Sequence, residues 1–261
     1  MSANHTRIIA VANEKGGVGK TVTVINLGGA LAMKQKKVLI VDMDPQANAT
    51  KGFGVEVEEN RPTTYDIISN DTPHTAKDAI VHTPWEGLDL IPSNVDLSGA
   101  EIELVDEQGR ENRLKEALAD ITDAYDFIFL DTPPSLSLLT VNVLSFAKDV
   151  LVPCQTHPYA FEALEELFDT IDIVRAEINP DIAVSGVLAT FYDKRTRISQ
   201  MILDNLKSDE RYKDLLFNTV IRTNTTIAES AGAGKPVVFY RKSSYGAEDY
   251  RHLAEELLAR S

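Results

Sequence analysis

The chain has 261 residues, 43% of them hydrophobic, which is enough to bury one substantial core. Acidic residues outnumber basic ones by 40 to 26, so the net charge of −14 argues against a protein that simply coats nucleic acid and limits DNA binding to a local patch. Cys154 is the single cysteine, which excludes an internal disulfide framework and fits a reducing cytoplasm, and no apolar run approaches the roughly 18 residues that span a membrane.

Short apolar runs rich in β-branched residues alternate with longer amphipathic stretches. This alternation predicts a doubly wound, mostly parallel α/β sheet flanked by helices, in a single domain, 1–261. Prolines interrupt Val55–Glu86, and we assign no element there. The predicted strands are Arg7–Asn13, Lys37–Asp42, Leu88–Pro92, Asp126–Asp131, Asp149–Pro153, Ile182–Phe191 and Leu215–Ile221, and the predicted helices are Lys20–Lys34, Arg110–Ile121, Leu136–Phe146, Phe161–Ile178, Ser199–Lys207, Thr225–Ala231 and Tyr245–Arg260.

The first predicted strand leads into a glycine-rich segment, and the first predicted helix follows it directly. Such a loop can surround an anion with its amide groups, and the helix N-terminus favours phosphate. Lys20 would then reach the β- and γ-phosphates of a nucleotide, and the Thr21 hydroxyl would ligate Mg²⁺. A glycine-rich surface turn is the alternative, but it leaves the strand–loop–helix order unexplained. The residues predicted to contact phosphate are Lys15, Gly16, Gly17, Val18, Gly19, Lys20, Thr21 and Val22.

The loop departs from the standard phosphate-loop pattern, because Glu14 stands where that pattern has glycine and Lys15 adds a second lysine. It resembles the deviant Walker A motif of the ParA/MinD family of ATPases. Val22 stands where members of that family often carry threonine or serine. The resemblance implies a homodimer that forms on ATP binding, with Lys15 reaching the partner's nucleotide. A cation there neutralises charge on the transferred phosphoryl group. For Lys15 alone, a solvated lysine is the alternative.

The second predicted strand ends in Asp42-Met43-Asp44-Pro45-Gln46. Carboxylates at the carboxyl end of a parallel strand lie at the ligand edge of the sheet. The motif resembles the switch motif of partition ATPases, which implies that Asp44 orients or deprotonates the attacking water while Asp42 supports the strand end. Asp-Pro is also typical of a simple turn.

The run Phe127–Leu130 is apolar and ends at Asp131, which is a Walker B pattern. Such an aspartate holds Mg²⁺ through water, because this ion keeps much of its hydration shell. The predicted metal residues are therefore Thr21, Asp44 and Asp131, and the predicted catalytic residues are Lys15, Lys20 and Asp44.

Val187–Asp193 and Asn218–Asn224 resemble the family strands whose ends frame the adenine. The resemblance implies a base contact from Asn224. It also implies one from Arg222, which stands where proline is common in relatives. A turn residue is the alternative for a strand-end asparagine.

Four function classes share this loop: partition ATPases, membrane-cycling relatives, iron–sulfur reductases and tyrosine kinases. One cysteine per chain does not supply a cluster's ligands, and the tyrosines do not gather in a flexible tail. Membrane cycling needs a basic amphipathic terminus. The terminal helix instead places Leu253, Leu257 and Leu258 on one face and Glu248, Asp249, Glu255 and Glu256 on the other. Anionic lipid repels that face, so we expect no membrane binding and keep the membrane-cycling regulator as the alternative.

Partition is thus the expected branch: a cytoplasmic ATPase switch, nucleoid-associated when ATP-bound, that positions DNA or another cargo through non-specific binding to double-stranded DNA. A ParB-like partner would stimulate hydrolysis. Thr223 and Thr226 replace arginines common in relatives, and the remaining cations are either a DNA patch or solvated surface groups. The predicted DNA contacts are Lys194, Arg195, Arg197, Lys235, Arg241, Lys242 and Arg251.

Overall fold

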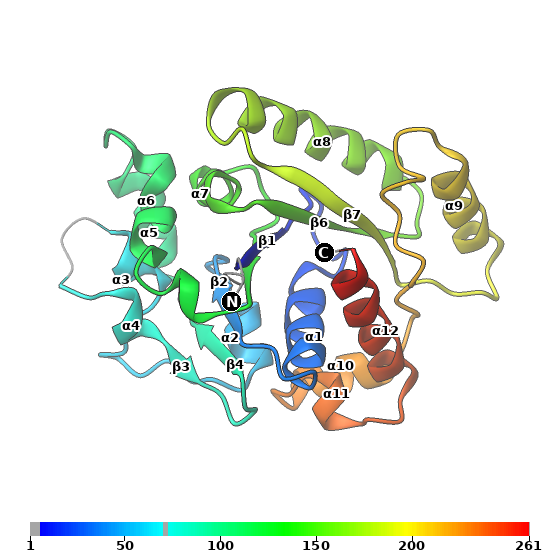
Figure 1. Ribbon diagram of the computed structural model, residues 1–261, viewed down its shortest axis with the longest axis horizontal. Coiled ribbons are helices and arrows are strands. Elements are labelled where there is room, and N and C mark those ends of the chain that lie inside the picture. The colour runs from blue at the N-terminus through cyan, green and yellow to red at the C-terminus, as the bar shows by residue number, and fades with distance from the viewer. Residues whose placement is uncertain (1–5, 70–72, 261) are drawn as a thin grey trace, which may run out of the picture.

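The structure, a computed structural model, describes residues 6–69 and 73–260. In chain order its strands are β1 (Arg7–Val11), β2 (Val38–Asp42), β3 (Val81–His82), β4 (Leu88–Ile91), β5 (Phe127–Asp131), β6 (Asp149–Gln155) and β7 (Ala183–Thr190). Across the described residues they form one sheet of seven strands in the order β3-β4-β2-β5-β1-β6-β7, in which only β3 runs antiparallel to its neighbour. Helices cover both faces of this sheet (Figure 1).

The three central strands are β1, β5 and β2, and nearly every residue in them is buried because their sequences are almost wholly apolar. Their register aligns the carboxyl ends: Asp131 pairs with Val11 on one side and with Asp42 on the other. Two aspartates therefore lie side by side at the edge of the sheet where the phosphate loop begins.

One face of the sheet is covered by α1 (Lys20–Ala32), α10 (Thr225–Gly232), α11 (Val237–Tyr240) and α12 (Tyr245–Ala259), which lie below it in Figure 1. On α12, Leu253 and Leu257 are fully buried in the core of this face. The expectation that Asp249 lies on the solvent face of this helix is wrong. Asp249 is buried, and its carboxylate binds the Arg222 guanidinium, which offsets the cost of burying the charge.

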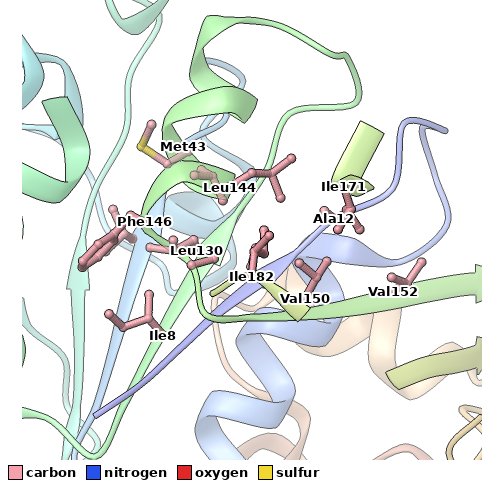
Figure 2. Close-up of a cluster of buried hydrophobic side chains, with 14 of the residues drawn as sticks. Ile8, Ala12, Met43, Leu130, Leu144, Phe146, Val150, Val152, Ile171 and Ile182 are labelled. Atoms are coloured by element: carbon pink, nitrogen blue, oxygen red, sulfur yellow. The ribbon is translucent and has the colours of Figure 1, made fainter. Parts of the chain in front are cut away.

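The other face is covered by α5 (Leu97–Glu103), α6 (Arg113–Leu118), α7 (Leu138–Phe146), α8 (Ala160–Glu177) and α9 (Arg197–Ser208). Figure 2 shows Leu144 and Phe146 of α7 beside Ile8, Leu130 and Val150, which come from three neighbouring strands. The remaining helices are α2 (Asn48–Gly52), α3 (Thr64–Ile68) and α4 (Ala76–Ala79), with the 3₁₀ turns η1 (Arg110–Asn112) and η2 (Thr122–Ala124). In the described part of the chain, no helix is both long enough and apolar enough to cross a membrane.

Six predicted strands are confirmed within a few residues, but the prediction of a strand over Leu215–Ile221 is wrong. This segment runs beside β7, where Val187 N donates to Leu215 O and Ile221 N to Ala189 O. Between those contacts the N–H groups of Asn218 and Thr219 donate to the Glu256 carboxylate instead, which interrupts the ladder. The remaining strand of the sheet is β3, which lies in the region Val55–Glu86, where we predicted no element. Residues 70–72 of this region lie outside the described residues.

All seven predicted helices are present with shifted ends, and Arg110–Ile121 contains η1 followed by α6. The sequence patterns did not predict α2, α3, α4, α5 or α11. Each has at most 7 residues, which is too short for a helical periodicity to be recognised.

Candidate functional site

The phosphate loop joins the end of β1 to the start of α1 at the carboxyl edge of the sheet. Gly17 and Gly19 adopt left-handed backbone angles, with φ of 75° and 95°, which other residues rarely tolerate. This backbone lets the loop curve around a cavity of about 460 Å³, which is lined by Gly16, Gly17, Gly19, Lys20, Thr21 and Asp44, among others. The cavity therefore combines loop backbone, a helix N-terminus and the Lys20 cation, which can bind a nucleotide's phosphates, with the Asp44 carboxylate.

The Lys20 side chain is buried under the loop. Its ammonium group donates to the carbonyl oxygens of Asn13 (2.9 Å) and Lys15 (3.2 Å). Burial lowers the pKa of Lys20, while the carboxylates of Asp131 and Asp44 oppose that change. The cation is thus held between the loop and the acids, where it can compensate phosphate charge.

Asp131, at the end of β5, is fully buried, and within the described residues neither of its carboxylate oxygens has a hydrogen-bond partner. Burial, followed by the neighbouring Asp42, raises the pKa of Asp131 well above its ordinary value. Thr21 lies close enough to lower this pKa, although it forms no complete hydrogen bond with the carboxylate. A buried carboxylate without partners requires a counterpart, and Mg²⁺, which prefers oxygen ligands, fits beside the Thr21 hydroxyl.

No group of three or more His, Cys, Asp or Glu side chains in 6–69 and 73–260 forms a ready-made metal cage. Mg²⁺ commonly binds through one or two protein oxygens, together with water and substrate phosphates. The residues present therefore suit an ion that arrives with a nucleotide.

Asp42 and Asp44 have different surroundings although they are two residues apart. The Asp42 carboxylate accepts hydrogen bonds from the N–H of Asp44 (3.1 Å) and from the N–H and hydroxyl of Thr50 (both 2.8 Å). Burial raises the pKa of Asp42 to about 6, and these hydrogen bonds oppose the rise. Asp44 lines the phosphate cavity, with one oxygen accepting from Gln46 N at 2.9 Å. Asp42 thus holds the strand end, whereas Asp44 is available to a ligand.

Lys15 does not line the phosphate cavity. Its N–H donates to the Asn13 side chain (2.9 Å), which in turn donates to Pro153 O (2.8 Å). Its ammonium group lies 5.5 Å from the centroid of the Tyr159 ring. The two lysines of the loop therefore occupy separate places, with Lys20 at the phosphate cavity and Lys15 outside it.

A smaller cavity of about 130 Å³ adjoins the first and shares Gly19, Val22 and Phe191 with it. Arg222 and Asn224, the two predicted base contacts, both line this cavity, which adjoins the phosphate site.

Both side chains nevertheless have structural partners. Arg222 Nε donates to the Asp249 carboxylate (2.9 Å), and the guanidinium also binds Glu248 (2.7 Å). Asn224 Oδ1 caps α10 by accepting from Thr226 N at 2.8 Å. Both side chains therefore form part of the cavity wall while their polar groups are engaged in these structural contacts.

Phe191, Asn48 and Lys51 line the phosphate cavity but were not among the predicted site residues. Phe191 has a left-handed φ of 51°, and its position directly after β7, at the ligand edge of the sheet, was the signal that could have identified it. Asn48 and Lys51 belong to the short helix α2, for which the sequence carried no signal.

The seven predicted DNA contacts fall into two groups along the chain: three beside the start of α9 and four around α10 to α12. The Arg195 guanidinium binds the Asp193 carboxylate through two hydrogen bonds (3.0 and 2.8 Å). Arg251 donates to Lys242 O at 2.7 Å, which draws these two residues together. Each group thus contains one arginine that is paired with an acid, because the Arg241 guanidinium of the second group lies 3.9 Å from Glu229.

Comparison with known proteins agrees with this geometry. A family model described as an AAA domain matches residues 6–184. The chain is 44% identical over 253 residues to the sporulation initiation inhibitor protein Soj of Bacillus subtilis, covering 97% of this chain and 98% of that protein. It is 41% identical over 262 residues to the chromosome partitioning protein ParA of Caulobacter vibrioides (strain NA1000 / CB15N), covering 100% and 97%.

Solved structures are also similar. One is a cobyrinic acid a,c-diamide synthase from Mycobacterium smegmatis with bound ADP and magnesium, with 36% identity, a TM-score of 0.82 and coverage of 97% of this chain and 94% of that one. Another is the cell division ATPase MinD of Pyrococcus furiosus, with 25% identity, a TM-score of 0.79 and coverage of 98% and 99%.

Proposed function

The chain belongs to the ParA/MinD family of P-loop ATPases, and from that premise we propose that it is a partition switch, formed by one domain over 1–261. ATP with Mg²⁺ is its substrate and cofactor pair. In this proposal the ATP-bound chain dimerises in the cytoplasm and binds DNA without sequence preference. This binding allows it to position a cargo. Hydrolysis, stimulated by a ParB-like partner, then resets it.

The observation that carries the proposal is the separation of the two loop lysines. Lys20 is buried at the phosphate cavity, whereas Lys15 lies outside it over Tyr159. In that position the Lys15 side chain does not line the phosphate cavity of its own chain, and it is suited to reach the nucleotide of a second copy. Dimerisation would thus complete the site.

Each residue then has a role in hydrolysis. The loop N–H groups and Lys20 would bind the phosphates, and Thr21 with Asp131 would hold Mg²⁺, which would neutralise phosphoryl charge. Asp44 faces the cavity and orients or deprotonates the attacking water. Lys15 of the second copy stabilises the charge that develops on the transferred group.

DNA binding and the stimulating partner are further parts of the proposal. With a net charge of −14, one chain opposes approach to a polyanion. A dimer presents each cationic group twice, and two linked weak contacts bind much more tightly than one. Relatives named for chromosome partitioning support this branch.

Sedimentation with ATP and with ADP tests the switch. Lys20→Ala should lose nucleotide binding, Lys15→Ala should bind ATP but remain monomeric, and Asp44→Ala should bind ATP and accumulate as a dimer because hydrolysis is blocked. A monomeric Asp44→Ala protein saturated with ATP contradicts the proposal.

Vesicles test the membrane-cycling alternative. The side of α12 turned away from the core carries the half-buried acid Glu248 and the exposed acid Glu255. Vesicles with anionic headgroups should therefore fail to recruit the ATP-bound protein. Recruitment of the ATP-bound protein to such vesicles would establish the alternative.

A further inference from the structure

A second groove lies on the α5–α7 side of the molecule, away from the α10–α12 side. It encloses about 500 Å³ and is lined partly by apolar side chains, among them Val105, Leu136 and Ile178. Val105 and Leu136 are 52% and 54% exposed, and Ile102, on the adjoining helix α5, is 77% exposed. Apolar side chains gathered around a groove in this way mark an interaction surface.

The charge around the groove has one dominant sign. The segment 101–111 contains five acids and one cation, Arg110. Glu101 and Glu111 line the groove itself, together with Arg110. The occupant that complements this surface is therefore basic as well as apolar.

Two polar atoms of the groove have no partner. Glu101 Oε1 and Ser137 Oγ are shielded from solvent, and neither makes a hydrogen bond within the described residues. Ser137 is the N-cap residue of α7, yet its side chain does not cap the helix. Because a buried oxygen without a partner is costly, a lysine or arginine donor from an incoming chain would be stabilised there.

The groove is connected to the nucleotide site through one short segment, 132–138. Thr132 and Pro134 line the phosphate cavity, while Leu136, Ser137 and Leu138 line the groove. Thr140 ties this segment to α7 by donating to Ser135 O at 2.6 Å. A molecule seated in the groove therefore contacts the same loop that borders the phosphates.

We propose that this groove is the docking site for a basic amphipathic segment of the stimulating partner, and that its occupation acts on hydrolysis through 132–138. The inference rests on the proposed function, which it deepens by assigning the partner's surface and chemistry. The acidic rim selects a segment with lysine or arginine, and the apolar lining selects hydrophobic side chains at helical spacing.

The probe is a labelled synthetic peptide with leucines at i, i+3 and i+4 spacing and arginines elsewhere, and its control carries glutamate in place of arginine. Fluorescence anisotropy should show binding of the arginine peptide only. Glu101→Gln and Val105→Ala should each weaken it by about 5-fold or more. The matched controls Asp204→Asn and Met201→Ala, both on the exposed side of α9, should bind as the wild type does.

Phosphate release with ATP supplies the second readout: the arginine peptide should accelerate it in the wild type, and Glu101→Gln should reduce the acceleration.

Equal binding by the groove variants, binding of the glutamate peptide, or no binding of the arginine peptide overturns the docking site. Binding without acceleration overturns the coupling. Groove variants that lose ATP-dependent dimerisation, with peptide binding intact, would show that a second copy covers the groove. ATP binding by the wild type, measured separately, distinguishes these failures from failure of the proposed function.

Discussion

The ammonium group of Lys15 lies 5.5 Å from the centroid of the Tyr159 ring. Tyr159 is 70% exposed and has a left-handed φ of 72°, so the chain holds a large aromatic ring at the surface in an unfavourable backbone conformation. In this position the Lys15 side chain lies outside the phosphate cavity of its own chain.

Tyr159→Ala should remove the contact that positions Lys15 outside its own cavity and weaken ATP-dependent dimerisation about 2- to 5-fold, since an exposed cation–π contact contributes about 0.5–1 kcal/mol. Tyr159→Phe keeps the ring and should behave as the wild type. Sedimentation at several protein concentrations measures the effect, and nucleotide affinity of the monomer should not change. Identical dimerisation of the alanine and phenylalanine variants contradicts a role for the ring.

Lys242→Ala should weaken DNA binding more than Arg195→Ala does. Asp193 already neutralises Arg195, whereas the Lys242 ammonium group has no carboxylate partner in the described residues. Retention on DNA across a salt series should show the log–log slope reduced by about one per protomer for Lys242→Ala. Equal losses for both variants would contradict the distinction, and no retention of the ATP-bound wild type at low salt removes DNA binding from the proposal.

Glu256→Ala should lower the free energy of unfolding at neutral pH by about 1–3 kcal/mol, because it leaves the N–H groups of Asn218 and Thr219 without their acceptor. Glu255→Gln, which alters only an exposed pair with Lys34, is the control and should change it by less than about 1 kcal/mol. Urea denaturation measures both.

The effect of Glu256 should also depend on pH. Burial raises its pKa, but the hydrogen bonds from Asn218 and Thr219 and the charge of Arg260 outweigh burial and lower it overall. A carboxylate with a lowered pKa in the folded chain stabilises it above the pKa of the unfolded chain, and this stabilisation is lost as pH falls through the folded value. The difference between wild type and Glu256→Ala should therefore narrow below about pH 4.3. A constant difference at every pH would contradict it.

Cys154 should resist alkylation in the native protein. It is buried, and burial raises the pKa of its thiol to about 12. At pH 8 the native thiolate fraction is then roughly 1,000-fold lower than that of an unfolded chain. The native rate with iodoacetamide should keep rising with pH above 9, where the rate in denaturant levels off. Mass spectrometry measures both, and equal rates at pH 8 would show that the thiol is accessible.

Local sequence was sufficient for the phosphate loop and for most of the sheet. Gly17 and Gly19 require backbone angles that few other residues adopt, and the apolar run before Asp131 is long enough to identify a buried strand. These features depend on neighbouring residues, so a pattern of a few positions contains them. The Asp44 prediction also rested on a local motif, and the structure places this residue at the phosphate cavity.

Only the tertiary structure decided which polar groups are already engaged. Thr219 donates to Glu256, 37 residues further along the chain, and the predicted strand around it is therefore interrupted. Arg222 binds Asp249 for the same kind of reason. The groove joins Glu101 to Leu136 and Ile178, which no local pattern relates. Hydrogen bonds and cavities between distant segments depend on the packing of the whole sheet, and a sequence window does not contain that information.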